Sequence, residues 1–301
     1  MNNTSNSLVS GIDPASFSAV TGPSQDLFRF VNGPWVDMYR LPDDRSRYGS
    51  FDKLAEDAEN QIRDILEEDD CPAVKSRALY HSFLDVDAID AAGLAAIEDQ
   101  LASIDEAEDK AALTRALGAM NPTGGPDLIG IAVYGDPGAP ETNVVHIEQD
   151  GLDLPDEAYY REDHYAPIRE AYVEMVAKQL KNAHLAAGDE DAHAQAKRFL
   201  DVETRIAANH WDNVSTRDSV KTYNPTDYAD LCAMLADVDL DAWIDGRQNA
   251  YDATTAAAVQ PLDFRGCFSH TIVHEPSFLT GLNAFWKEAS LDDLKLWADR
   301  K

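Results

Sequence analysis

Apolar residues recur at helical spacing through long, strongly charged stretches of this chain, which constrains most of it to amphipathic helices. The clearest stretch starts at Ser50 and carries the apolar residues Phe51, Leu54, Ala58, Ile62 and Ile65. Asp52 falls in the first turn of this helix, where the helix dipole favours an acidic side chain. The same spacing predicts further helices over residues 72–84, 88–104 and 110–120, two long ones carrying 168–180 and 199–206, one opened by Pro276 and one starting at Leu291. We therefore expect a mainly α-helical, multi-helix fold.

A short region in the middle of the chain departs from this pattern. Residues 128–134 and 143–147 are β-like and are joined by the turn-forming residues 135–138. Residues 269–274 form another short extended piece. These segments predict a small β element inserted in a helical protein.

Other local signals concern where helices begin. The first 45 residues are rich in glycine and proline turns and contain one short helical piece, around residues 26–31. Asn224 is expected to cap a further helix, with Pro225 at its first position and Asp227 in its first turn.

The chain is strongly acidic, with 25 lysine and arginine residues against 55 aspartate and glutamate residues and a formal net charge of −30. We expect no nucleic-acid partner, because a phosphate-binding surface needs a basic stripe. An anionic membrane surface is disfavoured for the same reason. Hydrophobic residues make up 44% of the chain, enough to bury a core, so the acidity belongs to the surface of a folded protein.

The sequence also predicts where the protein resides. No stretch reaches the roughly 18 to 20 apolar residues that a membrane-spanning helix needs, and the polar start lacks the regions of a secretory signal. The three cysteines, Cys71, Cys232 and Cys267, are too widely spaced for a disulfide framework or a Cys-x-x-Cys zinc site. We therefore expect a reducing, cytoplasmic setting without a membrane partner.

The histidines His270 and His274 are the strongest candidates for a metal site from the residues alone. On a helix they would share a face and could bind one ion. The β-branched residues between them and Pro276 just after them favour a strand instead, with the two rings about 13 Å apart. Gly124 and Gly125 precede a strand, which predicts a hairpin rather than a phosphate-binding loop. By this reasoning the chain carries no self-contained catalytic set.

Several segments together resemble a known family. Residues 30–35 read Phe-Val-Asn-Gly-Pro-Trp, and residues 45–52 read Arg-Ser-Arg-Tyr-Gly-Ser-Phe-Asp. Three later segments follow in the same order, namely 151–155 (Gly-Leu-Asp-Leu-Pro), 203–207 (Glu-Thr-Arg-Ile-Ala) and 221–225 (Lys-Thr-Tyr-Asn-Pro). From about residue 25 to residue 301 the chain resembles the neprilysin-like zinc metalloendopeptidases, the bacterial endopeptidase O group in particular.

The resemblance covers only the N-terminal half of that family. Members continue into a thermolysin-like catalytic part with a zinc-binding His-Glu-x-x-His motif, which this sequence lacks. Residues 283–286, Asn-Ala-Phe-Trp, look like the family's Asn-Ala-Phe-Tyr strand but lie in a helical pattern. The last predicted helix reaches Lys301 with no glycine cap and no proline beyond it. We therefore expect a fragment of a larger bacterial peptidase that cleaves short peptides, with the zinc in the absent C-terminal catalytic half. We expect this chain alone to be inactive and to bind no catalytic zinc.

The resemblance also implies two substrate-binding residues. The arginine with which the family holds the C-terminal side of a peptide matches Arg47, and a guanidinium can grip a carboxylate or carbonyl with two hydrogen bonds. Its alternative interpretation is a surface ion pair with an acidic residue. Asp52 matches the family's acid at the same subsite, although a first-turn helical role explains it equally well. The family often has a second arginine three residues after this acid, where this chain has Ala55, so the resemblance does not fix the fine specificity.

The resemblance implies three regions and leaves two functions open. Residues 1–48 would pack near the cleft, residues 49–268 would form a helical cap lobe with the β insertion near 127–148, and residues 269–301 would begin the return to the catalytic lobe. In this interpretation the lobe limits access of peptides to the cleft. The alternative is a non-catalytic helical module, a peptidase relic that binds peptides or a partner protein.

Overall fold

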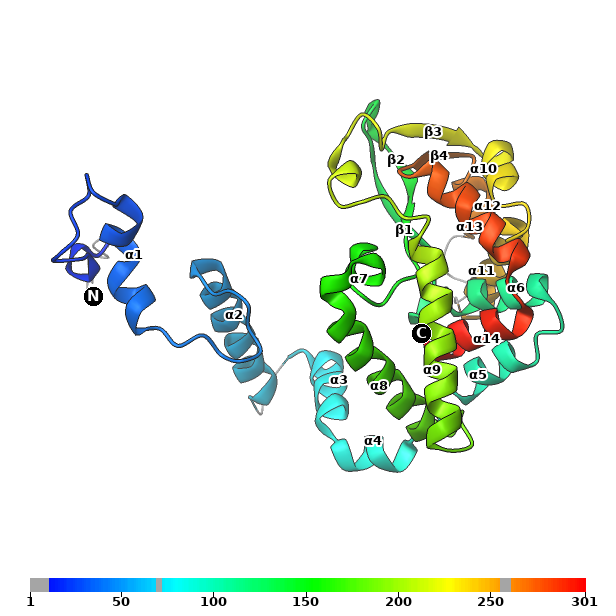
Figure 1. Cartoon of the computed structure of the whole chain (residues 1–301), viewed down its shortest axis with the longest axis horizontal. Helices are drawn as coiled ribbons and strands as arrows, with labels where there is room; N and C mark the ends of the chain where they lie inside the picture. The colour runs from blue at the N-terminus through cyan, green and yellow to red at the C-terminus, as the bar shows by residue number, and fades with distance from the viewer. Residues whose placement is uncertain (1–10, 69–71, 255–260) are drawn as a thin grey trace. The chain divides into compact units, whose positions relative to one another are not determined.

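The computed structural model describes residues 11–68, 72–254 and 261–301, and it confirms a mainly α-helical fold with a small sheet (Figure 1). The chain divides into two compact units, unit 1 (Met1–Ala91) and unit 2 (Ala92–Lys301). None of the described helices is both long and apolar enough to span a membrane. The predicted boundaries at 48 and 268 remain predictions about function, and the strand and helices within 269–301 are part of unit 2.

Unit 1 consists of short helical elements. They are the 3₁₀ turn Pro14–Ser16 and the helices α1 (Leu27–Met38), α2 (Ser50–Glu67), α3 (Val74–Leu84) and α4 (Val86–Ala92). The prediction of a short helical piece around 26–31 was wrong in length, because α1 continues through Gly33 and Pro34. Pro34 has no N–H for the carbonyl of Phe30, and that carbonyl accepts a hydrogen bond from the N–H of Ser18 instead (2.7 Å).

The apolar face of α2 has no cover within the described part of unit 1. The predicted helix is confirmed, but Phe51 is 88% exposed and Leu54 is 62% exposed. Gly33 is the sole buried residue among those of unit 1 that the structure describes. An exposed apolar face of this kind is typical of a surface that another structure covers.

Unit 2 contains the remaining helices and the core. Its helices are α5 (Glu98–Asp105), α6 (Lys110–Met120), α7 (Ala158–Arg161), α8 (Ala166–Asn182), α9 (Asp189–Ala207), α10 (Tyr228–Met234), α11 (Leu240–Thr254), α12 (Phe264–Cys267), α13 (Pro276–Glu288) and α14 (Leu291–Arg300). Short 3₁₀ turns lie at Asn121–Thr123, Asp163–Tyr165 and Ser215–Arg217. The single helix predicted over 88–104 was wrong, because the chain breaks between α4 and α5 at Gly93, which has a φ of +53°.

The sheet of unit 2 has four strands in the order β1-β2-β4-β3. They are β1 (Ile129–Asp136), β2 (Ala139–Gln149), β3 (Asn224–Asp227) and β4 (His270–Val273). β1 and β2 form an antiparallel hairpin, as predicted, while β2 and β4 run parallel and β3 and β4 antiparallel. Strands far apart in the sequence therefore meet in one sheet (Figure 1).

The prediction that Asn224 caps a helix was wrong. Asn224 begins β3, and its side-chain amide donates to the carbonyl of Val273 in β4 (2.9 Å). The helix begins three residues later than expected, and Asp227 caps it by accepting from the N–H of Asp230 (2.9 Å). Pro225 has no N–H to donate. Because β3 is an edge strand of the sheet, no further strand loses a hydrogen bond through this proline.

The core of unit 2 is one continuous cluster of aliphatic and aromatic side chains from its helices and strands. Its largest fully buried side chains include Trp286 of α13, Trp297 of α14 and Phe199 of α9. At the end of α13, the ammonium group of Lys110 donates to the carbonyls of Trp286 (2.5 Å) and Lys287 (2.8 Å). A cation at a helix C-terminus satisfies carbonyls that have no partner in the helix and complements its dipole.

A buried polar network lies inside this helical packing. The carboxylate of Glu203 on α9 is fully buried and accepts from the hydroxyls of Tyr160 (3.0 Å) and Tyr172 (2.8 Å). It also accepts from the N–H of Asp153 (3.0 Å) and the ammonium of Lys301 (2.7 Å). Burial raises the pKa of Glu203, and the charge of Asp153 adds to this, while the charge of Lys301 and the hydrogen bonds from Lys301 and Tyr172 oppose that change.

Candidate functional site

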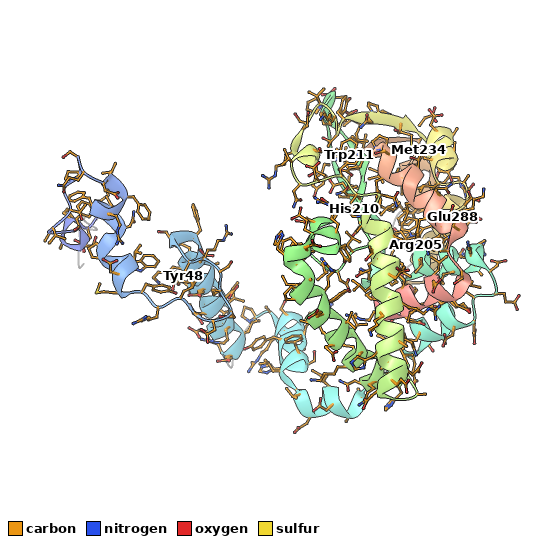
Figure 2. All side chains as sticks on the ribbon, in the orientation of Figure 1. Tyr48, Arg205, His210, Trp211, Met234 and Glu288 are labelled. Carbon is orange, nitrogen blue, oxygen red and sulfur yellow. The ribbon has the colours of Figure 1, made fainter. Side chains whose placement is uncertain are left out.

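The loop between α1 and α2 carries Arg47 and is held by stacked aromatic rings. Tyr39 stacks between Trp35 (ring centroids 4.7 Å apart) and Tyr48 (4.6 Å). The Tyr48 hydroxyl donates to Glu56 of α2 (2.6 Å), so the residue next to Arg47 is tied to the helix that follows (Figure 2). This hydrogen bond and burial raise the pKa of Tyr48, which stays a neutral donor.

A hollow of about 330 Å³ opens beside this loop, between α1 and the start of α2. Its lining combines aromatic and apolar residues with polar ones, and consists of Phe28, Asn32, Trp35, Val36, Tyr48, Gly49, Ser50 and Lys53. Five of these eight residues come from the two segments on which the family resemblance depends most. A hollow of this lining suits an apolar side chain of a ligand. Lys53 also lines it, and its ammonium pairs with Asp57 (2.7 Å).

Arg47 is exposed and makes no hydrogen bond or ion pair with any residue that the structure describes. The surface ion pair that was its alternative interpretation belongs to Arg45 instead, whose guanidinium lies 3.3 Å from Glu56. The guanidinium of Arg47 is therefore free for a ligand. Its role in substrate binding remains a prediction.

Asp52 has a structural role at the start of α2. Its carboxylate accepts from the N–H of Gly49 (2.8 Å), one of the donors that a helix start leaves unpaired. Its position in the first turn also complements the helix dipole. A second role at a substrate subsite remains a prediction.

His270, the first residue of β4, and His274, the residue that follows β4, do not form one metal site. The predicted strand is confirmed, and the two side chains take different partners. The Nε2 atom of His270 lies 3.3 Å from Asp136, and the Nε2 atom of His274 lies 2.9 Å from the Nδ1 atom of His146. Among residues 11–68, 72–254 and 261–301, no three His, Cys, Asp or Glu side chains are arranged to hold a metal ion. The described residues therefore do not fit a catalytic zinc.

His146 is a residue that sequence reasoning missed. It is only 4% exposed, and its ring also meets the edge of Tyr134 in the neighbouring strand. Burial, and the neighbouring ring of His146, lower the pKa of His274, whereas Glu148 opposes the change. Nothing in the local pattern of β2 indicates the contact, because His146 and His274 are far apart in the sequence.

A larger hollow in unit 2, of about 570 Å³, offers few free polar groups. Arg161 is bound to Glu157, and His210 contacts the carbonyl of Asp150 (2.9 Å). Trp211 donates to Ser277 (2.6 Å), so its side chain is also occupied (Figure 2). These side chains hold the end of α9 in place, and we assign no reaction to this hollow.

Comparison with known proteins places this geometry in a family. A family model described as peptidase family M13 matches residues 23–298. Human neprilysin is 27% identical over 234 residues, which cover 71% of this chain and 31% of neprilysin. Mouse membrane metallo-endopeptidase-like 1 is 26% identical over 212 residues, which cover 64% of this chain and 28% of that protein.

Solved structures agree with this assignment. The zinc metalloprotease Zmp1 of Mycobacterium tuberculosis, solved with an inhibitor, is 31% identical and has a TM-score of 0.83. The match covers 97% of this chain and 43% of Zmp1. PepO of Lactobacillus rhamnosis, at 18% identity and a TM-score of 0.70, shares the fold. The chain spans less than half the length of these relatives, and over that span it belongs to peptidase family M13, as an N-terminal region of the neprilysin-like type.

Proposed function

We propose that this chain is the substrate-access region of a neprilysin-like zinc metalloendopeptidase that cleaves short peptides. In this proposal the helical lobe limits which peptides reach the cleft, and Arg47 holds the C-terminal side of the peptide. The observation that carries the proposal is the free guanidinium of Arg47, whose neighbour in the chain, Tyr48, lines an aromatic hollow, in a segment that matches the family. Asp52 supports this site by fixing the start of α2.

The chemistry of the hollow supports a peptide ligand. A guanidinium can donate two parallel hydrogen bonds to a terminal carboxylate or to a peptide carbonyl. Trp35 and Tyr48 line the hollow, and Tyr39 stacks between them, so their rings supply a rigid apolar surface for a neighbouring side chain. Charge and apolar contact together would favour a short peptide with an apolar residue near its C-terminus.

We further propose that the rest of a longer protein is the structural partner of unit 1. The uncovered apolar residues of α2 support this, because a stable helix of this kind normally buries its apolar face. The catalytic zinc and its ligands would belong to that C-terminal part, since the described residues do not fit a catalytic zinc.

The purified 301-residue chain is expected to hydrolyse no peptide. Its sequence has no His-Glu-x-x-His motif to hold a metal-activated water, so we expect no cleavage of a fluorogenic peptide and no stoichiometric zinc by mass spectrometry. A longer form that includes the C-terminal half serves as the positive control. Peptide cleavage by the short chain that a zinc chelator abolishes would contradict the proposal.

Replacing Arg47 by alanine in that longer form is expected to raise KM for short peptides about 10-fold or more, with kcat changed much less. The reason is that a charge-assisted hydrogen bond to the substrate is lost while the reacting groups stay in place. Steady-state kinetics with a peptide acid and the matching C-terminal amide measure the effect, which should be smaller for the amide.

Arg45→Ala is the matched control, because Arg45 lies two residues away but pairs with Glu56 rather than remaining free. It should leave KM nearly unchanged. Arg47→Lys should recover part of the affinity, since it keeps the charge but not the planar fork. Unchanged kinetics of Arg47→Ala would remove this residue from the proposed site.

A further inference from the structure

The strand β1 forms an open edge of the sheet in unit 2. It lies at one end of the strand order, with β2 as its sole neighbour among the described strands. The carbonyl of Ile147 in β2 accepts from the N–H of His274, so the main-chain groups of Ile147 face β4 and not β1. In an antiparallel pair this makes Ile131↔Ile147 a non-hydrogen-bonded pair. The N–H and C=O groups of Ile131 and, two residues on, of Val133 therefore point away from the sheet.

This edge lacks the features that normally protect an edge strand. From Ile129 to Gly135 there is no proline and no charged residue. Val133 is 64% exposed and Tyr134 is 60% exposed. No residue in the described part of the chain forms a hydrogen bond with the outward main-chain groups of β1. Natural edges of this length are usually blocked by charges, prolines or covering segments, so this one is a template for an added strand.

Two acidic side chains, one in β2 and one just after it, lie close to Gly130 of the edge strand. A Cβ atom at this glycine would lie 3.5 Å from the Cβ of Glu148 and 3.7 Å from the Oδ2 atom of Asp150. Asp150 uses its other oxygen to bind the N–H of Gly151, and half of the Glu148 side chain is exposed. Because Gly130 has no side chain, a lysine or arginine on an added strand can reach across it to these carboxylates.

We propose that the β1 edge binds an extended peptide segment that carries basic side chains, by adding it to the sheet as a further strand. The open main-chain groups of Ile131 and Val133 would pair with the segment, and Glu148 with Asp150 would select a basic side chain. A second copy of this acidic chain is the weaker candidate, since its net charge of −30 opposes self-association. This surface belongs to unit 2 and does not depend on the proposed role of Arg47 in unit 1.

The test is fluorescence anisotropy of the 301-residue chain with a short labelled peptide of alternating valine and lysine, blocked at both ends. Val133→Pro removes an outward N–H and leaves the β1–β2 hydrogen bonds intact, so it should weaken binding about tenfold. Val133→Thr keeps the N–H and a β-branched side chain and should bind like the native chain. The same peptide with N-methylated alternate residues should not bind.

A second variant tests the charge and does not alter the strand. Glu148→Gln should weaken binding of the lysine peptide several-fold, and added salt should do the same, while a norleucine version of the peptide should bind the native and Glu148→Gln chains equally. Arg47→Ala should leave binding unchanged, which separates this surface from the proposed substrate site. Circular dichroism confirms that each variant is folded.

Three results would overturn the proposal. They are equal binding by the folded Val133→Pro and Val133→Thr chains, equal binding of the lysine peptide by the native and Glu148→Gln chains, and self-association of the chain that Val133→Pro abolishes in sedimentation experiments. The last result would assign the edge to a second copy of the chain.

Discussion

Replacing Glu203 by alanine is expected to lower the free energy of unfolding of unit 2 by about 3–5 kcal/mol. The side chain is fully buried and accepts four hydrogen bonds. Its removal leaves the Tyr160 hydroxyl and the Asp153 N–H without an acceptor, while Tyr172 and Lys301 lose one of two, since both also bind the carboxylate of Asp153. Each buried donor left without an acceptor costs about 1–3 kcal/mol, more if it is charged. Urea unfolding followed by tryptophan fluorescence measures the loss, since four of the five tryptophans lie in unit 2.

Two conservative variants serve as controls for Glu203. Glu203→Gln keeps one oxygen acceptor and the shape of the side chain, so we expect a loss of about 1–2 kcal/mol. Tyr172→Phe removes one hydroxyl donor and leaves the carboxylate with its other partners, so we expect about 1 kcal/mol. If Glu203→Ala were no more destabilising than Tyr172→Phe, the network would not hold α9 to its neighbours as we infer.

Replacing Gly246 by alanine is expected to destabilise unit 2 by about 3 kcal/mol. A Cβ atom at Gly246 of α11 would lie 2.0 Å from the carbonyl oxygen of Arg115 in α6. The contact is reciprocal, because a Cβ at Gly118 of α6 would lie 2.0 Å from the carbonyl oxygen of Trp243 in α11. Both obstacles are backbone atoms, which cannot rotate away, so the two helices would have to separate.

The intrinsic preference of alanine for helices makes this a stringent test. In an exposed helix, glycine to alanine stabilises by roughly 1 kcal/mol, so a loss of stability must come from the helix contact. Gly188→Ala is the control for added volume, since nothing lies within 4 Å of its Cβ position. Gly188 is the N-cap of α9, where alanine is less favourable than glycine, so it should cost up to about 1 kcal/mol, well below Gly246→Ala. Equal midpoints for Gly246→Ala and the native chain in urea would contradict a close α6–α11 contact.

Local periodicity predicted most of the helices of this protein. The apolar spacing that begins at Ser50 placed α2 at its first residue, and the segment over 110–120 coincides with α6. The predicted hairpin appears as β1 and β2 because its turn residues are contiguous with both strands. Helices and hairpins depend on contacts between residues close in the chain, so a single sequence can reveal them.

Segments with distant partners were harder to predict. Asn224 and Pro225 carry a good helix-start signal, but pairing with β4 draws them into a strand. The helix α1 passes through Gly33 and Pro34 because Ser18, well before the helix, takes up the carbonyl that the proline cannot serve. In both cases a partner outside the local window outweighs a local preference.

The candidate site also combines features that the sequence indicates with features that only the structure shows. The resemblance gave Arg47 and Asp52 as candidate substrate-binding residues, and the sequence already allowed a first-turn helical role for Asp52. The structure adds that Asp52 accepts a hydrogen bond at the start of α2 and that Arg47 is free. The sequence could not have indicated that Arg45, rather than Arg47, pairs with Glu56, since both arginines lie at a similar distance from Glu56 in the chain.

By itself, the sequence determined a mainly helical, acidic chain of the neprilysin-like type, because helical periodicity, charge and ordered motifs are properties of neighbouring residues. Only the tertiary structure decided that His146 meets His274, that Gly118 and Gly246 let two helices touch, and that β1 is left as an open edge. The physical reason is that these features depend on which distant segments come together, and close packing and sheet pairing are fixed only when they do.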